Sequence, residues 1–329
     1  MPTIHLLLLL IFAATAVGCQ SGPQPDPISP SPGTNTPTFD EPDRPVAYLD
    51  GQPLRQHELF SVLAEMDGGL ALSEVLIDRR LAQRLDQQGL TLTPADIDYE
   101  KQLILDTLSE DEDQAVRLLR AMRERRGLGE LRYTALLRRN AGLRKLVRND
   151  ISVGEAAIRQ AYQLAYGPRY TVRLILCDTA QAAQRIRQHA LGGASFIDLA
   201  VQQSTDPSAA QGGLLSPISP ADATYPAALR DVLPTLATQD EAQRISPVLT
   251  LGQSYAVVRL EEVTPANGPG IDAVRNELTQ QVRLRLERLR MQQLAQTLIE
   301  GADLIVLDPT LKESWRRQRG SIEDAASPR

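Results

Sequence analysis

Residues that carry metal and redox chemistry are scarce in this chain. Its 329 residues include two cysteines, Cys19 and Cys177, and three histidines, His5, His57 and His189, which lie far apart in the sequence. Two cysteines can build neither a disulfide framework nor a cysteine-based metal site. The sequence therefore predicts no metal centre.

Aromatic residues are also few, at 4% of the chain, and the net charge is −6 at pH 7. Base stacking needs aromatic side chains, and contacts to phosphates need positive charge. The composition therefore argues against a nucleic-acid partner. The apolar fraction of 42% and the charged fraction of 23% are ordinary for a globular protein, and the length suffices for two domains.

The chain has little apolar sequence of the kind that crosses a membrane. The run from Leu6 to Val17 is shorter than the roughly 20 residues that a transmembrane helix needs, and its N-terminal place is typical of an export signal. We predict that residues 1–18 form this signal.

The signal ends in Ala16-Val17-Gly18-Cys19, which resembles a bacterial lipobox with Cys19 as the lipidated residue. Plain secretion with an incidental cysteine is the alternative. Gln20 follows the cysteine, and by analogy with lipoprotein sorting this favours an anchor in the outer membrane of a bacterial envelope, facing the periplasm.

Residues 19–45 are rich in proline, with serine, threonine and glycine between the prolines. Such a composition cannot bury a core and favours an extended spacer. We expect the segment to be a tether between the lipidated cysteine and the folded part of the chain.

The pattern from residue 46 to about 167 is helical after a short strand and turn at Val46–Leu54. An apolar stripe with a period of 3.6 residues runs from Leu72 to Leu85, and Thr93-Pro94 is typical of the start of a further helix. Within this region, the stretch from Arg117 to Arg148 is strongly basic. It is either a solvated helix surface or a patch that attracts anionic lipid head groups or acidic segments of other proteins.

The most specific stretch is Ser204-Thr205-Asp206-Pro207-Ser208-Ala209-Ala210-Gln211-Gly212-Gly213-Leu214-Leu215. The Asp-Pro and Gly-Gly pairs are turn signals, since glycine allows positive φ and close backbone approach. Gly193-Ala194-Ser195-Phe196 precedes it, a β-like string starts at Tyr170, and β-like alternation follows up to Leu260. Over roughly residues 168–263 the chain resembles the parvulin (rotamase, PpiC) family, whose signature is S-x-D-x-S-A-x-x-G-G-x-L.

This resemblance, together with the helices before it, implies a SurA- and PrsA-like α+β arrangement. A parvulin-like domain, 168–264, with a small antiparallel sheet flanked by helices, would be inserted into a helical chaperone domain. The N-terminal part of that domain would be 46–167. Its C-terminal part would be 265–310, with a long helix over Ile271–Glu300 and a short strand near Ala302–Val306 that pairs near Val46. The remainder, 311–329, would be a polar, frayed tail.

The resemblance also implies a site for prolyl isomerisation, which needs no cofactor. Parvulins usually place two histidines at the pocket centre, and here Leu174 and Ala256 stand at those positions. Asp206, which also fits a cap of its own turn, and Thr250 are the candidate catalytic residues. The candidate substrate-binding residues are Leu174, Leu215, Tyr225, Leu229 and Ala256.

Two functions remain open on these residues. One is a membrane-anchored isomerase with a weakened polar centre, acting on unfolded or nascent envelope proteins. The other is a non-enzymatic periplasmic chaperone or envelope-assembly lipoprotein, whose parvulin-like module binds extended peptide.

Overall fold

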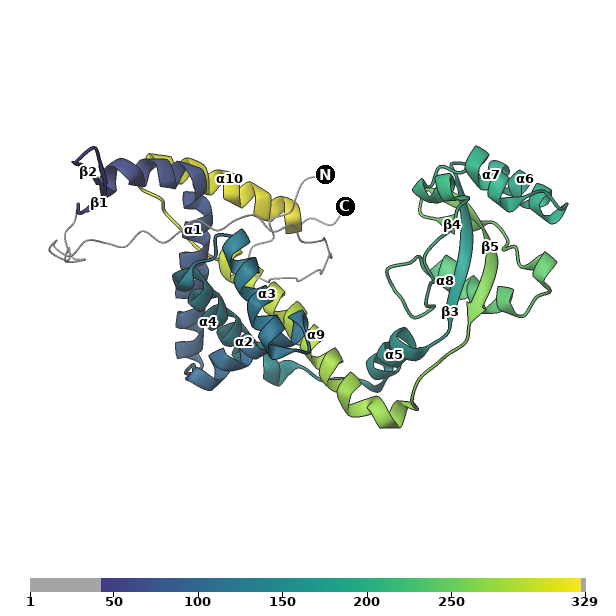
Figure 1. Ribbon diagram of the computed structural model, residues 1–329, viewed down its shortest axis with the longest axis horizontal. Coiled ribbons are helices and arrows are strands. Elements are labelled where there is room, and N and C mark those ends of the chain that lie inside the picture. Colours follow the sequence, from purple (N-terminus) through teal and green to yellow (C-terminus); the bar gives the residue numbers. More distant parts are fainter. Residues whose placement is uncertain (1–42, 327–329) are drawn as a thin grey trace. The chain divides into compact units, whose positions relative to one another are not determined.

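The structure, a computed structural model, describes residues 43–326 (Figure 1). The expected export signal, the lipidated Cys19 and most of the tether lie outside the described residues. Within 43–326, no helix is both long enough and apolar enough to cross a membrane. The chain forms two compact units, one containing 43–151 and 287–326 and the other containing Ser152–Leu286.

The first unit is helical apart from one hairpin. Its elements are β1 (Pro45–Leu49), β2 (Gln52–Arg55), α1 (Gln56–Gln87), α2 (Pro94–Leu108), α3 (Glu112–Arg125), α4 (Glu130–Val147), the end of α9 (Ile271–Glu300) and α10 (Pro309–Ala326). Asp50 and Gly51 both have positive φ, as a two-residue hairpin turn between antiparallel strands requires. Thr93 caps α2 as expected: its side chain accepts a hydrogen bond from the Asp96 backbone N–H.

The end of α9 packs into the core of the helical unit. Met291, Ala295 and Ile299, spaced by four residues, are buried against Ile77 and Leu81 of α1. Leu289, on the same helix, is half exposed. Segments from both ends of the chain therefore share one core.

The last segment of the chain departs from the expected polar, frayed tail. It forms the helix α10, in which Trp315 is buried. Gly69 of α1 donates its backbone N–H to the Ser314 hydroxyl at 2.9 Å, and a Cβ at Gly69 would overlap the Ser314 carbonyl. A helix of mainly polar composition packs here because small residues on α1 let its backbone come close.

The strand expected at 302–306 does not form. Leu304 and Val306 are partly buried in the core and Ile305 between them is exposed, so the segment is extended but has no strand partner. The strand near Val46 pairs with β2 through the hairpin instead.

The second unit is built around a small antiparallel sheet with the order β3-β5-β4. Its helices and strands are α5 (Glu155–Tyr166), β3 (Arg169–Cys177), α6 (Ala180–Leu191), α7 (Phe196–Gln203), α8 (Ala227–Ala237), β4 (Leu249–Leu251), β5 (Ser254–Thr264) and the start of α9. It also contains the short 3₁₀ turns η2 (Pro207–Gln211) and η3 (Glu241–Gln243), whereas η1 (Arg148–Asp150) follows α4 in the helical unit. The helical unit is formed by N-terminal and C-terminal segments, and the unit with the small antiparallel sheet is inserted between them in the sequence. This confirms the expected α+β class.

The second unit extends further than the expected range 168–264. The Tyr162 hydroxyl of α5 donates to the Pro269 carbonyl at 3.0 Å, and Arg275 of α9 pairs with Glu155 at 2.7 Å. These contacts join α5 and the start of α9 within the same unit as the sheet.

Part of the basic stretch from Arg117 to Arg148 belongs to the internal structure of the helical unit, while cations such as Arg117 and Arg120 are exposed. Its cations with carboxylate partners are Arg123, Arg132, Arg139, Arg144 and Lys145. Lys145 donates a hydrogen bond to Asp96, and chiefly for this reason the pKa of Asp96 is lowered to about 2. Many of these charges therefore hold α4 to α1 and α2 rather than facing solvent.

Candidate functional site

The two faces of the sheet bury different helices. Side chains alternate between faces along β3, so Leu174 belongs to a cluster with Leu229 of α8, while Ile175 belongs to a cluster with Phe196 of α7. The predicted substrate-binding residues Leu174, Leu215, Tyr225, Leu229 and Ala256 all belong to the α8 cluster. The structure therefore brings this predicted set together on one face.

The residues of this set differ in how much of their surface is exposed. Leu174 is 6% exposed, Leu229 2% and Ala256 0%, so these three form the floor of the face. Leu215 and Tyr225 are partly buried and lie above that floor. Leu215 and Tyr225 are therefore the members of this set that keep exposed surface.

Asp206 begins the short 3₁₀ turn η2 and caps it. Its carboxylate accepts hydrogen bonds from the Ser208 backbone N–H at 2.9 Å and from the Ser208 hydroxyl at 2.6 Å. The Ser204 hydroxyl accepts hydrogen bonds from the Asp206 and Leu176 backbone N–H groups. The Ser-x-Asp-x-Ser string thus fastens the turn to the end of β3, and Asp206 is engaged in that structural role.

The glycine pair brings the next segment onto the edge of β3. Gly212 and Gly213 have φ of 65° and 75°, which favour glycine. The Leu174 N–H donates to the Gly213 carbonyl at 2.7 Å, and the Leu215 N–H donates to the Val172 carbonyl at 3.0 Å. A Cβ at Gly213 would overlap the Leu174 carbonyl oxygen, so this close approach requires glycine.

Thr250 is not brought together with the other predicted residues. It pairs with Tyr255 across β4 and β5, and Tyr255 packs in the α7 cluster. Residues directly opposite each other in an antiparallel pair share a face. Thr250 is therefore exposed on the face opposite to Leu174 and Ala256.

Metal chemistry has no candidate site in the described part of the chain, where no group of three or more His, Cys, Asp or Glu side chains could hold an ion. The Cys177 thiol is 4% exposed. Burial, and to a lesser extent the charge of Asp178, raises the pKa of Cys177, so the thiol is held in its unreactive form.

Comparison with known proteins identifies this region. Residues 153–276 match the sequence profile of the PPIC-type PPIASE domain. Residues 153–276 therefore form a parvulin-type, or PPIC-type, domain. Similar proteins include YacD of Bacillus subtilis strain 168, which is 22% identical over 268 residues, covering 79% of this chain and 84% of YacD. They also include the foldase protein PrsA 1 of Listeria monocytogenes serovar 1/2a, which is 22% identical over 273 residues and covers 82% of this chain and 86% of PrsA 1.

Among solved structures, the foldase PrsA of Streptococcus pneumoniae aligns with a TM-score of 0.39 and 17% identity, over 82% of this chain and 98% of that structure. Within this chain, the parvulin-type match of 153–276 lies wholly within the second compact unit. The signature string, the sheet and the α8 face therefore belong to one domain.

Two features of the parvulin-type domain were not predicted from the sequence. Arg173 on β3 donates to the carbonyls of Gln211 and Gly212 at 3.0 and 2.8 Å and pairs with Glu261 at 3.1 Å, so it holds the glycine turn in place. The sequence feature that could have pointed to Arg173 is its position as a charged residue within an otherwise apolar strand. Arg230 similarly donates to the Tyr225 and Pro220 carbonyls and fixes the loop that carries Tyr225.

Beside that loop lies a pocket of about 520 Å³, lined in part by Tyr162, Ala221, Arg230 and Ile271. None of these residues was a candidate, because they come from α5, the loop, α8 and α9, which lie apart in the sequence. A second and larger pocket lies in the helical unit, between α1 and α4.

Proposed function

We propose that this protein is an exported folding factor of the bacterial envelope, which binds extended, proline-containing segments of unfolded proteins and isomerises their X-Pro bonds slowly. The parvulin-type domain at 153–276 supports the class of reaction. The name foldase, carried by PrsA 1 of Listeria monocytogenes, supports unfolded proteins as partners.

The chemistry of the reaction makes modest demands on the protein. An X-Pro bond rotates over a barrier of about 18–20 kcal/mol, and a catalyst must bind the twisted amide better than the planar one. The twisted amide has less charge separation, so an apolar surface favours it, while polar groups orient it. The α8 face supplies the apolar surface, with Leu215 and Tyr225 as its accessible part.

The slow rate rests on the inferred replacement of the polar centre. The resemblance to parvulins puts Leu174 and Ala256 at the positions of the two family histidines, and both are buried apolar residues of the α8 cluster. Asp206 is occupied by its own turn and Thr250 lies on the other face, so neither replaces the missing groups. A loss of about 2–3 kcal/mol of transition-state stabilisation corresponds to a roughly 30- to 150-fold slower enzyme.

The same observation favours a second candidate, a chaperone without isomerase activity. Apolar side chains gather on β1 and the first half of α1, where Tyr48, Leu49, Leu63 and Met66 are more than half exposed. Exposed apolar surface of this kind is suited to holding unfolded segments. The two candidates differ only in whether catalysis of X-Pro rotation is measurable.

The first prediction concerns that rate. In a protease-free assay on an unstructured X-Pro peptide, the catalytic efficiency of the full chain should be roughly 30- to 150-fold below that of a parvulin with both histidines. A value equal to that reference would contradict the proposal, and complete absence of catalysis with retained peptide binding would establish the second candidate.

Restoring the histidines one at a time extends this test. Leu174→His replaces one side chain by another of similar size and should raise the efficiency. Ala256 is fully buried, so Ala256→His places a ring where only a methyl group fits and should destabilise the domain by about 1–3 kcal/mol or more. The double variant is therefore expected to lose the fold before it regains activity.

The second prediction concerns the anchor. We propose that Cys19 is lipidated and that the following proline-rich segment tethers the folded units to the outer membrane. A Cys19→Ser protein should then move from the membrane fraction to the soluble fraction of the envelope, because the acyl chains that hold it are lost. Export of the wild-type chain in fully soluble form would overturn the anchor without affecting the first prediction.

A further inference from the structure

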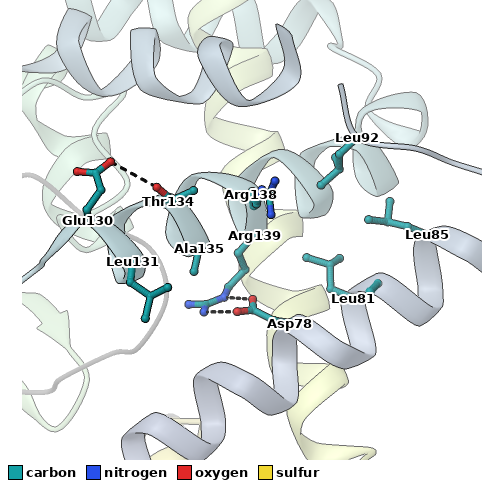
Figure 2. Close-up of a pocket in the computed structure, with 11 residues that line it drawn as sticks. Asp78, Leu81, Leu85, Leu92, Glu130, Leu131, Thr134, Ala135, Arg138 and Arg139 are labelled. Carbon is teal, nitrogen blue, oxygen red and sulfur yellow. Dashed lines mark hydrogen bonds and ion pairs between the residues drawn. The ribbon is translucent and has the colours of Figure 1, made fainter. Parts of the chain in front are cut away.

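A groove of about 680 Å³ lies between α1 and α4 in the helical unit. Figure 2 shows Leu81 and Leu85 on α1, with Leu92 from the following loop and Leu131 and Ala135 on α4. Leu131 is 86% exposed, so an apolar side chain stands at the groove without a partner of its own. The groove therefore offers apolar surface that a ligand can cover.

Most charges around this groove are already neutralised within the protein. Arg139 makes two hydrogen bonds to Asp78, at 2.6 and 2.9 Å, and these cross the groove in Figure 2. Glu130 pairs with Arg123 at 2.7 Å, and the hydrogen bond from Arg123 is the main reason why the pKa of Glu130 is lowered.

Arg138 is the exception. It lines the groove and is exposed, and among the described residues 43–326 no carboxylate pairs with it. The groove thus combines apolar walls with one uncompensated positive charge. That combination complements a ligand with apolar side chains and one carboxylate.

The spacing of the walls fits an extended peptide. Leu81 and Leu85 are buried at the floor of the groove, whereas Leu131 and Ala135 keep exposed surface and are one helical turn apart on α4, about 6 Å along the axis. Alternate side chains of an extended chain are separated by about 6.6 Å and point to the same side. Two apolar residues at positions i and i+2 can therefore meet Leu131 and Ala135, with a neighbouring residue beside Arg138.

We propose that the α1–α4 groove binds an extended segment of an unfolded protein in which apolar residues at i and i+2 adjoin an aspartate or glutamate. This inference rests on the proposed function, because it assigns the partner of a chaperone unit. It adds a site separate from the parvulin-type domain and a preference for an acidic residue. The acidic preference follows from Arg138, and the apolar preference from Leu131 and Ala135.

The test uses the full chain and three labelled, unstructured peptides that share the apolar i, i+2 pair. They differ only in the neighbouring residue, which is glutamate, glutamine or lysine, and binding is followed by fluorescence polarisation at low and high salt. The glutamate peptide should bind about two- to fivefold more tightly than the glutamine peptide, the range expected for an exposed ion pair. Salt should weaken that preference.

Variants locate the binding in the groove. Arg138→Glu should abolish the preference for glutamate and reverse it in favour of the lysine peptide, while Arg120→Glu, the same change at an exposed position on α3, should leave it unchanged. Leu131→Ser should weaken all three peptides about tenfold or more, because the contact of a large apolar side chain is lost. Leu289→Ser, at a half-exposed position on α9, is the matched control.

Each outcome decides the inference. Equal binding of the three peptides, or equal effects of the Arg138 and Arg120 changes, overturns the acidic groove while leaving peptide binding by the protein intact. Absence of binding to any peptide overturns the groove together with the proposed function. A change of oligomeric state in Leu131→Ser, measured by sedimentation, would instead assign the groove to contact between copies of the chain.

Discussion

Replacing Gly213 by alanine should unfold the parvulin-type domain while the helical unit stays folded. Alanine at a φ of +75° costs about 1–2 kcal/mol, and its Cβ would overlap the Leu174 carbonyl oxygen. Relief of that overlap breaks the hydrogen bond from the Leu174 N–H to the Gly213 carbonyl, which contributes about 1 kcal/mol. Together with the strain of overpacking, we expect a loss of about 3–5 kcal/mol.

Gly252 provides the matched control. It has nearly the same φ, +67°, in the turn between β4 and β5, and no atom lies within 4 Å of the position of a Cβ. Gly252→Ala should therefore lower the free energy of unfolding only by the strain of alanine at positive φ, about 1–2 kcal/mol. Equal losses for the two variants would show that the contact with Leu174 is unimportant.

The single tryptophan separates the two units in this measurement. Trp315 lies on α10 of the helical unit, so its fluorescence reports unfolding of that unit. Hydrogen exchange of the β3 amides reports the parvulin-type domain. Gly213→Ala should raise exchange in β3 and leave the tryptophan transition where it is.

The sequence predicted those parts of the fold that depend on local pattern. The turn string from Ser204 to Leu215 was recognisable because its glycines and its Asp-Pro pair have fixed backbone roles, now seen at Gly213 and Asp206. Thr93 and the start of α2 were recognisable for the same reason. Local capping and turn chemistry can be read without knowing the distant neighbours.

Contacts between distant segments could not be read in this way. The tail appeared polar, and only the small Gly69 on α1 lets α10 pack and bury Trp315. The face on which Thr250 lies depends on the register between β4 and β5, which a short strand does not reveal. The basic stretch gave no sign that Arg139 and Arg144 were paired and Arg138 was not, because their partners come from other helices.

Replacing Arg144 by leucine should destabilise the helical unit by about 3–5 kcal/mol, a large share of the stability of an ordinary domain. Arg144 of α4 hydrogen-bonds to Glu100 of α2 and to Glu287 of α9, and both glutamate side chains are more than nine-tenths buried. Burial by itself lowers the pKa of Arg144. The hydrogen bonds that Arg144 makes to the two glutamates, and their negative charges, outweigh burial, so the pKa of Arg144 is raised. One cation thus joins three segments of the chain.

The pH dependence identifies the cause of this loss. Without Arg144, the two buried glutamates of the folded chain should stay protonated, because burial disfavours an unpaired carboxylate. In the unfolded chain the same glutamates lose their protons above about pH 4.3. The free energy of unfolding should therefore fall as pH rises from 5 to 8. Asp96 acts in the opposite direction and in another window. Its folded pKa of about 2 lies below the ordinary 3.8, so its contribution is present above pH 4 and is lost as pH falls toward 2.

The experiment follows Trp315 fluorescence in denaturant at pH 5 and pH 8, with Arg120→Leu as the control at an exposed position. Arg144→Leu should shift the tryptophan transition more at pH 8 than at pH 5 and leave hydrogen exchange in β3 unchanged. Adding Glu100→Met and Glu287→Met should recover most of the loss, since removing all three charges leaves no unpaired buried carboxylate. If the triple variant is as unstable as Arg144→Leu alone, packing rather than charge holds α2, α4 and α9 together at this point.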